Sequence, residues 1–188
     1  MSRRAAAFAL GLAVALLAGS LAVWYLTGHG RRGRSSGPRL VETGEAKVAL
    51  LADLYFPADG STLKAERREL AITRAPKDQV RKVIEALLAG PTGAGLVRPL
   101  PKEVSLGSVL LRDDGVAYVD LRWASHDDPP PAGSDAELQM VYSLVDSIAL
   151  NVPQAQRVVL LWNGTQRQTF SGHLDTSRPL VPMRDLVR

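Results

Sequence analysis

Apolar residues spaced as on one face of a helix stand out near the middle of the chain. Between residues 76 and 88 they recur at steps of three, one, three and one residues, a period that predicts an amphipathic helix. Pro76 suits the first helical position, and Gly90-Pro91 ends the helix. The stripe consists of Val80, Val83, Ile84, Leu87 and Leu88. We expect it to pack in the core.

A second stripe of apolar residues predicts another helix, which begins at Ser134. Glu137 stands three residues later, so these two residues match the S-x-x-E pattern of a capping box. Asn151-Val152-Pro153 ends the helix. Its stripe consists of Leu138, Val141, Tyr142, Val145 and Ile148.

Four apolar runs of strand length and one charged, partly exposed segment predict strands around these helices. They cover residues 48–56, 65–72, 104–111, 116–121 and 158–162, and for 65–72 a helix is the alternative. Asp113-Asp114-Gly115 predicts a tight hairpin turn, and Asn163-Gly164 predicts another, followed by a short strand near residues 168–170. The order β-β-α-β-β-α-β predicts an α+β fold: a two-layer sandwich in which a mixed or antiparallel sheet carries both main helices on one face.

An apolar run near the start of the chain has the length of a membrane span. Residues 5–26 carry no charge and follow Arg3 and Arg4. As a helix they would extend about 33 Å, which is enough to cross a hydrocarbon core. The run predicts either a retained transmembrane anchor or a signal peptide cleaved at Ala18-Gly19-Ser20. The apolar residues that continue from Leu21 to Leu26 favour the anchor.

The net charge of +4 belongs to the first 45 residues. Residues 1–45 hold six arginines and two glutamates, whereas residues 46–188 hold 17 basic and 17 acidic residues. This balance argues against a nucleic-acid partner. Residues 28–45 are rich in Gly, Ser and Arg and predict a flexible linker. The expected organisation is an anchor or signal sequence (1–27), the linker (28–45) and one domain (46–188).

Composition restricts the chemistry that the domain can perform. The chain has no cysteine, which excludes a disulfide scaffold, a thiolate zinc site and a cysteine nucleophile. Ser125-His126-Asp127 holds the residue types of a catalytic triad, but sequence neighbours cannot take the positions of nucleophile, base and orienting group, so a surface loop is expected. The acidic pairs Asp113-Asp114 and Asp127-Asp128 fit no EF-hand spacing. No cofactor is predicted.

Two further groups leave an alternative open. His173 and Asp175 could ligate a metal, but two ligands do not make a site, and the alternative is a turn in which His173 binds the backbone and Asp175 caps a loop. Trp123 and Trp162 could stack on glycan rings, or pack in or beside the core.

Several segments, in their order and spacing, resemble the GerMN domain of the sporulation and spore-germination GerM family. They are Leu54-Tyr55-Phe56, Leu87-Leu88-Ala89-Gly90-Pro91, Leu100-Pro101, Val116–Leu121, Tyr142–Val145 and Gly172–Asp175 ahead of Pro179-Leu180. The resemblance covers residues 46 to about 182. Its candidate motif or interaction residues are Gly90, Pro91, Gly172, His173 and Asp175.

The resemblance implies a non-catalytic binding or scaffold module of the bacterial cell envelope. Its partner would be an envelope protein or peptidoglycan, with self-association as a further option. The implied location is the bacterial inner (cytoplasmic) membrane, with a single span and the C-terminal domain outside the cytoplasm. An envelope enzyme acting on peptidoglycan is the alternative. Many relatives carry two such domains or a lipid-modified cysteine, whereas this chain has one domain and no cysteine.

Overall fold

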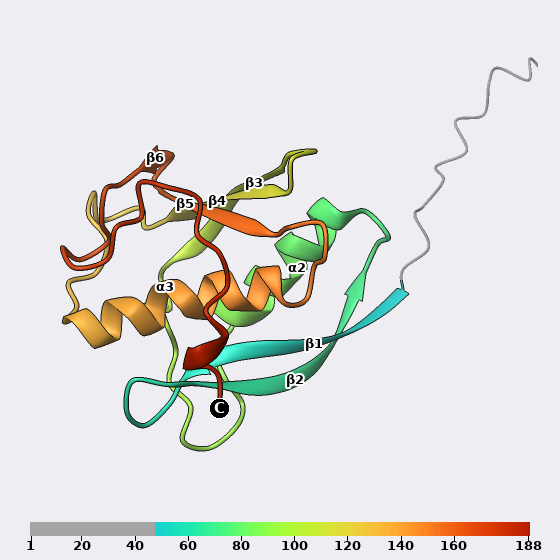
Figure 1. The fold of residues 1–188 in the computed structure, drawn as a ribbon, viewed down its shortest axis with the longest axis horizontal. Coiled ribbons are helices and arrows are strands. Elements are labelled where there is room, and N and C mark those ends of the chain that lie inside the picture. Colours follow the sequence, from blue (N-terminus) through green and yellow to red (C-terminus); the bar gives the residue numbers. More distant parts are fainter. Residues whose placement is uncertain (1–47) are drawn as a thin grey trace, which may run out of the picture. The chain divides into compact units, whose positions relative to one another are not determined.

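The computed structural model describes residues 48–188 (Figure 1). The predicted anchor or signal sequence (1–27) and the linker (28–45) lie outside the described residues. Within 48–188, no helix is both long and apolar enough to cross a bilayer. The elements are β1 (Val48–Pro57), β2 (Leu63–Ile72), α2 (Pro76–Leu88), β3 (Ser105–Leu111), β4 (Val116–Arg122), α3 (Ser134–Ala149), β5 (Arg157–Trp162), β6 (Thr165–Gln166) and the 3-10 helix η1 (Arg184–Leu186).

The described chain forms two sheets, where the sequence predicted one. Strands β1 and β2 make a two-stranded antiparallel hairpin, and β3, β4, β5 and β6 make a four-stranded sheet in that order. Helix α3 packs on β1 and β5, and α2 packs on β1, β2 and β3. The helices therefore lie between the hairpin and the larger sheet, so the predicted two-layer sandwich is wrong in its number of layers (Figure 1).

Polar side chains of α3 explain why the hairpin stays apart from the other sheet. Ser147 Oγ accepts the amide of Tyr55 at 2.9 Å, and Ser143 Oγ donates to the carbonyl of the same residue. Asn151 binds both backbone groups of Asp53, at 2.9 and 2.7 Å. Ser143 and Ser147 lie four apart on one face of α3, and Asn151 follows just after the helix ends. Together they follow β1 as a neighbouring strand would. The edge of β1 is thus occupied by a helix.

The larger sheet is mixed. Strand β4 pairs antiparallel with β3 and parallel with β5, and β5 pairs antiparallel with β6. Both predicted turns are present: Gly115 has φ +81°, and Asn163 and Gly164 have φ +49° and +81°, as a hairpin turn of this type requires. The last strand lies at Thr165–Gln166, directly after the second turn, and not at residues 168–170.

Both helices bury most of the predicted stripes, and their bounds agree closely with the sequence. Leu88 and Leu138 are half-buried and pack against the core. On α2 the buried residues are Val80, Val83, Ile84 and Leu87. The capping box predicted for α3 is wrong, because the N-cap is Gly133 and no side chain caps the helix. Glu137 makes longer-range contacts instead. On β5, Trp162 is fully buried, and its ring meets Trp123 and Phe170 edge-on, so both tryptophans pack in or beside the core.

Candidate functional site

Gly90 and Pro91 lie where the chain leaves α2. Gly90 has φ +88°, a conformation that residues with a β-carbon rarely adopt, and its amide donates to the Leu87 carbonyl at 3.0 Å. A β-carbon at this position would lie 2.6 Å from Nη2 of Arg98. The backbone therefore requires glycine, and a β-carbon would in addition displace the guanidinium at the end of the Arg98 side chain.

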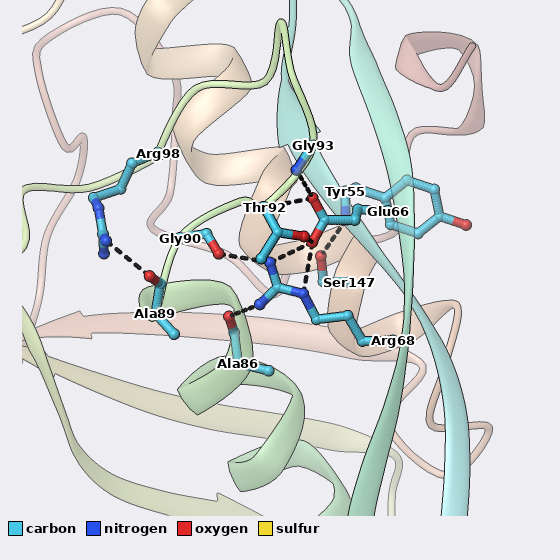
Figure 2. Close-up of polar contacts among 10 residues, drawn as sticks. All are labelled: Tyr55, Glu66, Arg68, Ala86, Ala89, Gly90, Thr92, Gly93, Arg98 and Ser147. Atoms are coloured by element: carbon cyan, nitrogen blue, oxygen red, sulfur yellow. Dashed lines mark hydrogen bonds and ion pairs between the residues drawn. The ribbon is translucent and has the colours of Figure 1, made fainter.

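Two arginines bind carbonyl oxygens that have no partner within the end of α2 (Figure 2). Arg68 donates from Nη1 to the Ala86 carbonyl at 3.0 Å and from Nη2 to the Gly90 carbonyl at 2.6 Å. Arg98 donates from Nη2 to the Ala89 carbonyl at 2.7 Å. Positive charge is favourable at this end of a helix, where carbonyl dipoles leave a partial negative charge.

Glu66 holds the loop that follows Pro91 (Figure 2). Its Oε2 accepts the amides of Thr92 and Gly93 at 2.8 and 2.7 Å, and its Oε1 accepts the Thr92 hydroxyl at 2.9 Å and Arg68 Nε at 2.6 Å. Burial alone would raise the pKa of Glu66, but the hydrogen bonds from Gly93, Arg68 and Thr92 together lower it to about 2. We call Glu66, Arg68 and Arg98, with the helix end that they bind, the helix-end cluster.

The helix-end cluster is a structural unit. Arg68 also lies over the ring of Phe56, 5.5 Å from its centroid. Sequence reasoning found Gly90 and Pro91 but missed the side chains that bind the end of α2. The available signal was the spacing of Glu66 and Arg68, which lie two apart on a strand and so share a face. Nothing local indicated that this face meets the end of α2.

His173 contacts a carboxylate that is buried in α3. Glu137 is fully buried, and its Oε1 accepts the amides of Phe170 and Ser171 at 2.9 and 2.7 Å. Its Oε2 lies 2.8 Å from the His173 amide and 3.0 Å from Nδ1 of the same residue. Burial would raise the pKa of Glu137, but the amides of Ser171, His173 and Phe170 and the imidazole outweigh that effect and hold the pKa below its usual value. Glu137 therefore ties residues 170–173 to the start of α3.

The other residues of the Gly172–Asp175 segment do not join this contact. Gly172 turns the chain with φ +98°, and its amide donates to the Thr169 hydroxyl at 3.1 Å. Asp175 caps the following turn, because its Oδ1 accepts the amide and hydroxyl of Ser177 at 2.9 and 2.6 Å. His173 thus pairs with a side chain, not with the backbone as the turn hypothesis expected. In the described residues, no hydrogen bond or ion pair links this segment to the helix-end cluster.

The remaining sequence candidates stay apart from both motif segments. Ser125 Oγ lies 2.9 Å from Nδ1 of His126, whose ring stacks on Trp123 at 3.7 Å, in an exposed loop. Across residues 48–188, no three His, Asp or Glu side chains are placed to hold a metal ion. A surface groove of about 730 Å³ runs beside the β3–β4 turn and includes Lys77, Asp113 and Gln156, and none of the five candidate motif residues lines it.

The outer edge of β2 is an exposed row of backbone groups beyond its first residue. At Leu63 the edge is occupied, because Val187 bridges to Leu63 and the Arg188 amide donates to the Leu63 carbonyl at 2.9 Å. Asp53 and Tyr55 of β1 direct their backbone groups to α3, and they oppose Arg67 and Ala65 in the hairpin. In an antiparallel pair, two opposed residues that do not hydrogen-bond each other direct their backbone groups to opposite edges of the pair. Arg67 and Ala65 therefore direct their backbone groups to the outer edge of β2. We define the β2 edge as the outward backbone groups of Ala65, Arg67, Glu69 and Ala71. Among the described residues these groups have no hydrogen-bond partner, and all four residues are exposed.

Comparison with known proteins places the chain in a family. Residues 53–168 match the family model "Germane: Sporulation and spore germination". The chain belongs to this family. The predicted GerMN resemblance is confirmed, and Gly90 and Pro91 fall within the matched residues, whereas Gly172–Asp175 lies beyond them.

Solved structures show the same GerMN fold. The crystal structure of a "Putative Lipoprotein" from Clostridium perfringens has a TM-score of 0.51 and 21% identity, and the match covers 72% of this chain and 88% of that one. The tandem GerMN domains of the sporulation protein GerM from Bacillus subtilis match with a TM-score of 0.51 and 14% identity over 74% of this chain. The match spans 48% of that tandem structure. No curated protein matches the chain significantly.

Proposed function

We propose that the GerMN domain of this chain is a non-catalytic binding or scaffold module of the bacterial cell envelope, related to sporulation or germination. The observation that carries this proposal is the exposed β2 edge. Strand β2 pairs with β1 without a register shift, so its free part, from Ala65 to Ala71, is straight. An extended segment of an envelope partner can add to such an edge through backbone hydrogen bonds.

The location follows from the N-terminal sequence. Residues 5–26 act as the membrane anchor, residues 28–45 as the linker, and the GerMN domain lies outside the cytoplasm. The Clostridium perfringens relative, which carries the name lipoprotein, supports an envelope location. Protein recovered from native membranes should retain its first residues. A mature chain that begins near Leu21 would show instead that the apolar run is a cleaved signal.

The polar residues at the motif segments are occupied by structural hydrogen bonds, which favours a binding role over catalysis. A carboxylate that orients a histidine is part of many acid–base sites, and Glu137 and His173 have that relation. However, both oxygens of Glu137 are occupied by the loop that it ties down, and Asp175 is directed to Ser177. The pair therefore supports a structural role.

A photoreactive phenylalanine analogue at Ala71 in the full-length chain tests the binding surface directly. Illumination of living cells should join the chain covalently to an envelope component through the β2 edge. The matched control carries the analogue at Lys102, which is exposed in a loop before β3. Equal adducts from both positions would contradict a binding surface at the edge.

The enzyme alternative has its own assay. Purified full-length chain is incubated with isolated peptidoglycan, and soluble fragments are measured. We expect no release. Release that disappears in the His173→Ala variant would replace the binding role with an envelope enzyme.

A further inference from the structure

We propose that the β2 edge pairs with the same edge of a second copy of this chain, in an antiparallel register centred on Arg68. The inference rests on the proposed function, since it takes the β2 edge as the interaction surface, and it names the occupant. Pairing would join two hairpins into one four-stranded sheet. Helix α3 already occupies the β1 edge, so the β2 edge is the side of the hairpin that can take a further strand.

The charges along β2 are complementary to themselves in this register. With Arg68 opposite Arg68 of the second copy, Arg67 lies opposite Glu69, and Glu69 lies opposite Arg67. Ala65 lies opposite Ala71 in the same way. All these residues direct backbone groups outward, so each opposed pair can exchange two hydrogen bonds. The dimer therefore satisfies the edge and forms two cross-strand ion pairs on the exposed face of the hairpin.

Neighbouring registers lack this complementarity. A shift of two residues in one direction places Arg67 opposite Arg67, and a shift in the other direction places Glu69 opposite Glu69. Parallel pairing in register would oppose like charges at both positions. Directly opposed like charges destabilise a strand pair, whereas opposite charges each contribute about 0.2–1 kcal/mol. The charge pattern therefore favours this register over its two neighbours and over parallel pairing in register.

One intramolecular contact of β2 must give way to pairing. In the proposed register Ile72 of the second copy lies opposite Lys64, so Arg188 must give up its hydrogen bond to the Leu63 carbonyl.

The side-chain contacts of β2 are compatible with pairing. Arg68 would lie opposite Arg68 of the second copy. The two guanidinium groups do not repel each other strongly, because each is paired with Glu66 of its own chain and directed to the carbonyls of Ala86 and Gly90. Arg67 binds Asp53 through Nε and Nη2 at 2.7 and 2.9 Å, which leaves Nη1 for Glu69 of the second copy.

Disulfide mapping tests the register in the full-length chain. The chain has no cysteine, so introduced cysteines report without background. Two differently tagged copies, Ala65→Cys and Ala71→Cys, are expressed together in the native membrane and oxidised. In the proposed register their Cα atoms lie about 5.5 Å apart, within reach of a disulfide. Two Ala65→Cys copies would lie about 20 Å apart along the strand and should not cross-link.

Charge exchange tests the ion pairs. Glu69→Arg places arginine opposite arginine at both positions, and Arg67→Glu places glutamate opposite glutamate. When either substitution is added to both the Ala65→Cys and the Ala71→Cys copy, cross-linking should fall about tenfold below that of the parent pair. A mixture of the two places Glu opposite Arg at both positions, and cross-linking should return. Glu103→Arg and Lys102→Glu make the same charge changes at exposed loop positions and should have no effect. Urea unfolding of each variant verifies that the fold is retained.

The outcomes separate this inference from the proposed function. Disulfides confined to the Ala65→Cys and Ala71→Cys pair, with recovery in the charge mixture, support the dimer. If that pair cross-links no more than Lys102→Cys with Ala71→Cys, the dimer is overturned. Photo-adducts at Ala71 that contain a different envelope component would then leave the proposed function standing, and equal adducts at Ala71 and Lys102 would remove both.

Discussion

At the residue scale, Gly90 shows how a single position can be constrained twice. Gly90→Ala must adopt φ +88° with a β-carbon and must also displace the Arg98 guanidinium. Gly95 provides a matched control, because it has φ +74° and open space around it. We expect Gly95→Ala to lower the free energy of unfolding by about 1–2 kcal/mol and Gly90→Ala to lower it by about 2 kcal/mol more. Urea denaturation measures both losses.

Repeating both glycine substitutions in an Arg98→Ala chain isolates the contribution of Arg98. In Arg98→Ala chains no guanidinium lies beside the β-carbon, so the two glycine substitutions should cost the same. If they already cost the same in the parent chain, Arg98 does not contribute to the requirement for glycine at position 90.

Glu137 is the second residue whose role depends on distant partners. Glu137→Gln cannot accept on both sides of its head group, so some donors of residues 170–173 lose their partner. We expect a loss of about 1–3 kcal/mol in the free energy of unfolding and faster hydrogen exchange at the His173 amide. Asp135→Asn is the control, because this exposed residue of the same helical turn makes no contact with that loop. Unchanged exchange at His173 would contradict the tether.

At the scale of elements, α3 acts as the neighbour of β1. Ser147→Ala leaves the Tyr55 amide buried without an acceptor, which costs about 1–3 kcal/mol. Ser108→Ala, at an exposed position of β3, should change the free energy of unfolding by less than about 0.5 kcal/mol. Hydrogen exchange should accelerate at Tyr55 and remain slow in β4 and β5. Uniform acceleration across the domain would mean that the hairpin does not open separately.

The same contacts explain which features could be predicted from the sequence. The apolar stripe of α2 and the Asp-Gly and Asn-Gly turns are local patterns, and their elements lie where expected. Ser143, Ser147 and Asn151 are polar residues at helical spacing, which usually indicate a face in water. Their targets on β1 lie 88 to 98 residues away in the sequence, so no local pattern reveals them. The single predicted sheet was wrong for this reason.

The site residues divide in the same way. Gly90, Gly172 and Asp175 occupy turns that glycine or a short acidic side chain favours, and the sequence indicated them. Glu137 matched a capping pattern, and the local interpretation hid its contact with residues 170–173, 33 to 36 positions later. The β2 edge had no signal at all, because a free edge is defined by the absence of a neighbour and not by residue type.

At the scale of the whole molecule, carboxylates with opposite pKa shifts set the pH dependence of stability. Burial raises the pKa of Asp146 to about 6 from its ordinary 3.8, against the Met183 amide and Arg184. The folded state then binds a proton more tightly than the unfolded state, so Asp146 makes stability fall as pH rises from about 4 to 6. Glu66 and Glu137 have lowered pKa values, so their contributions are complete above about pH 4.5 and are lost in acid.

These opposing slopes predict that stability is greatest near pH 4–5 and decreases on both sides. Each slope is at most about 1.4 kcal/mol per pH unit for one proton. Asp146→Asn should flatten the profile between pH 4 and 6, and Glu66→Gln should flatten it between about pH 2 and 4.5 while lowering stability at neutral pH. Urea unfolding at a series of pH values measures these profiles. If Asp146→Asn retains the parent slope between pH 4 and 6, another group binds that proton. Because Asp146 and Glu66 lie on different elements, the double variant should show both changes added together.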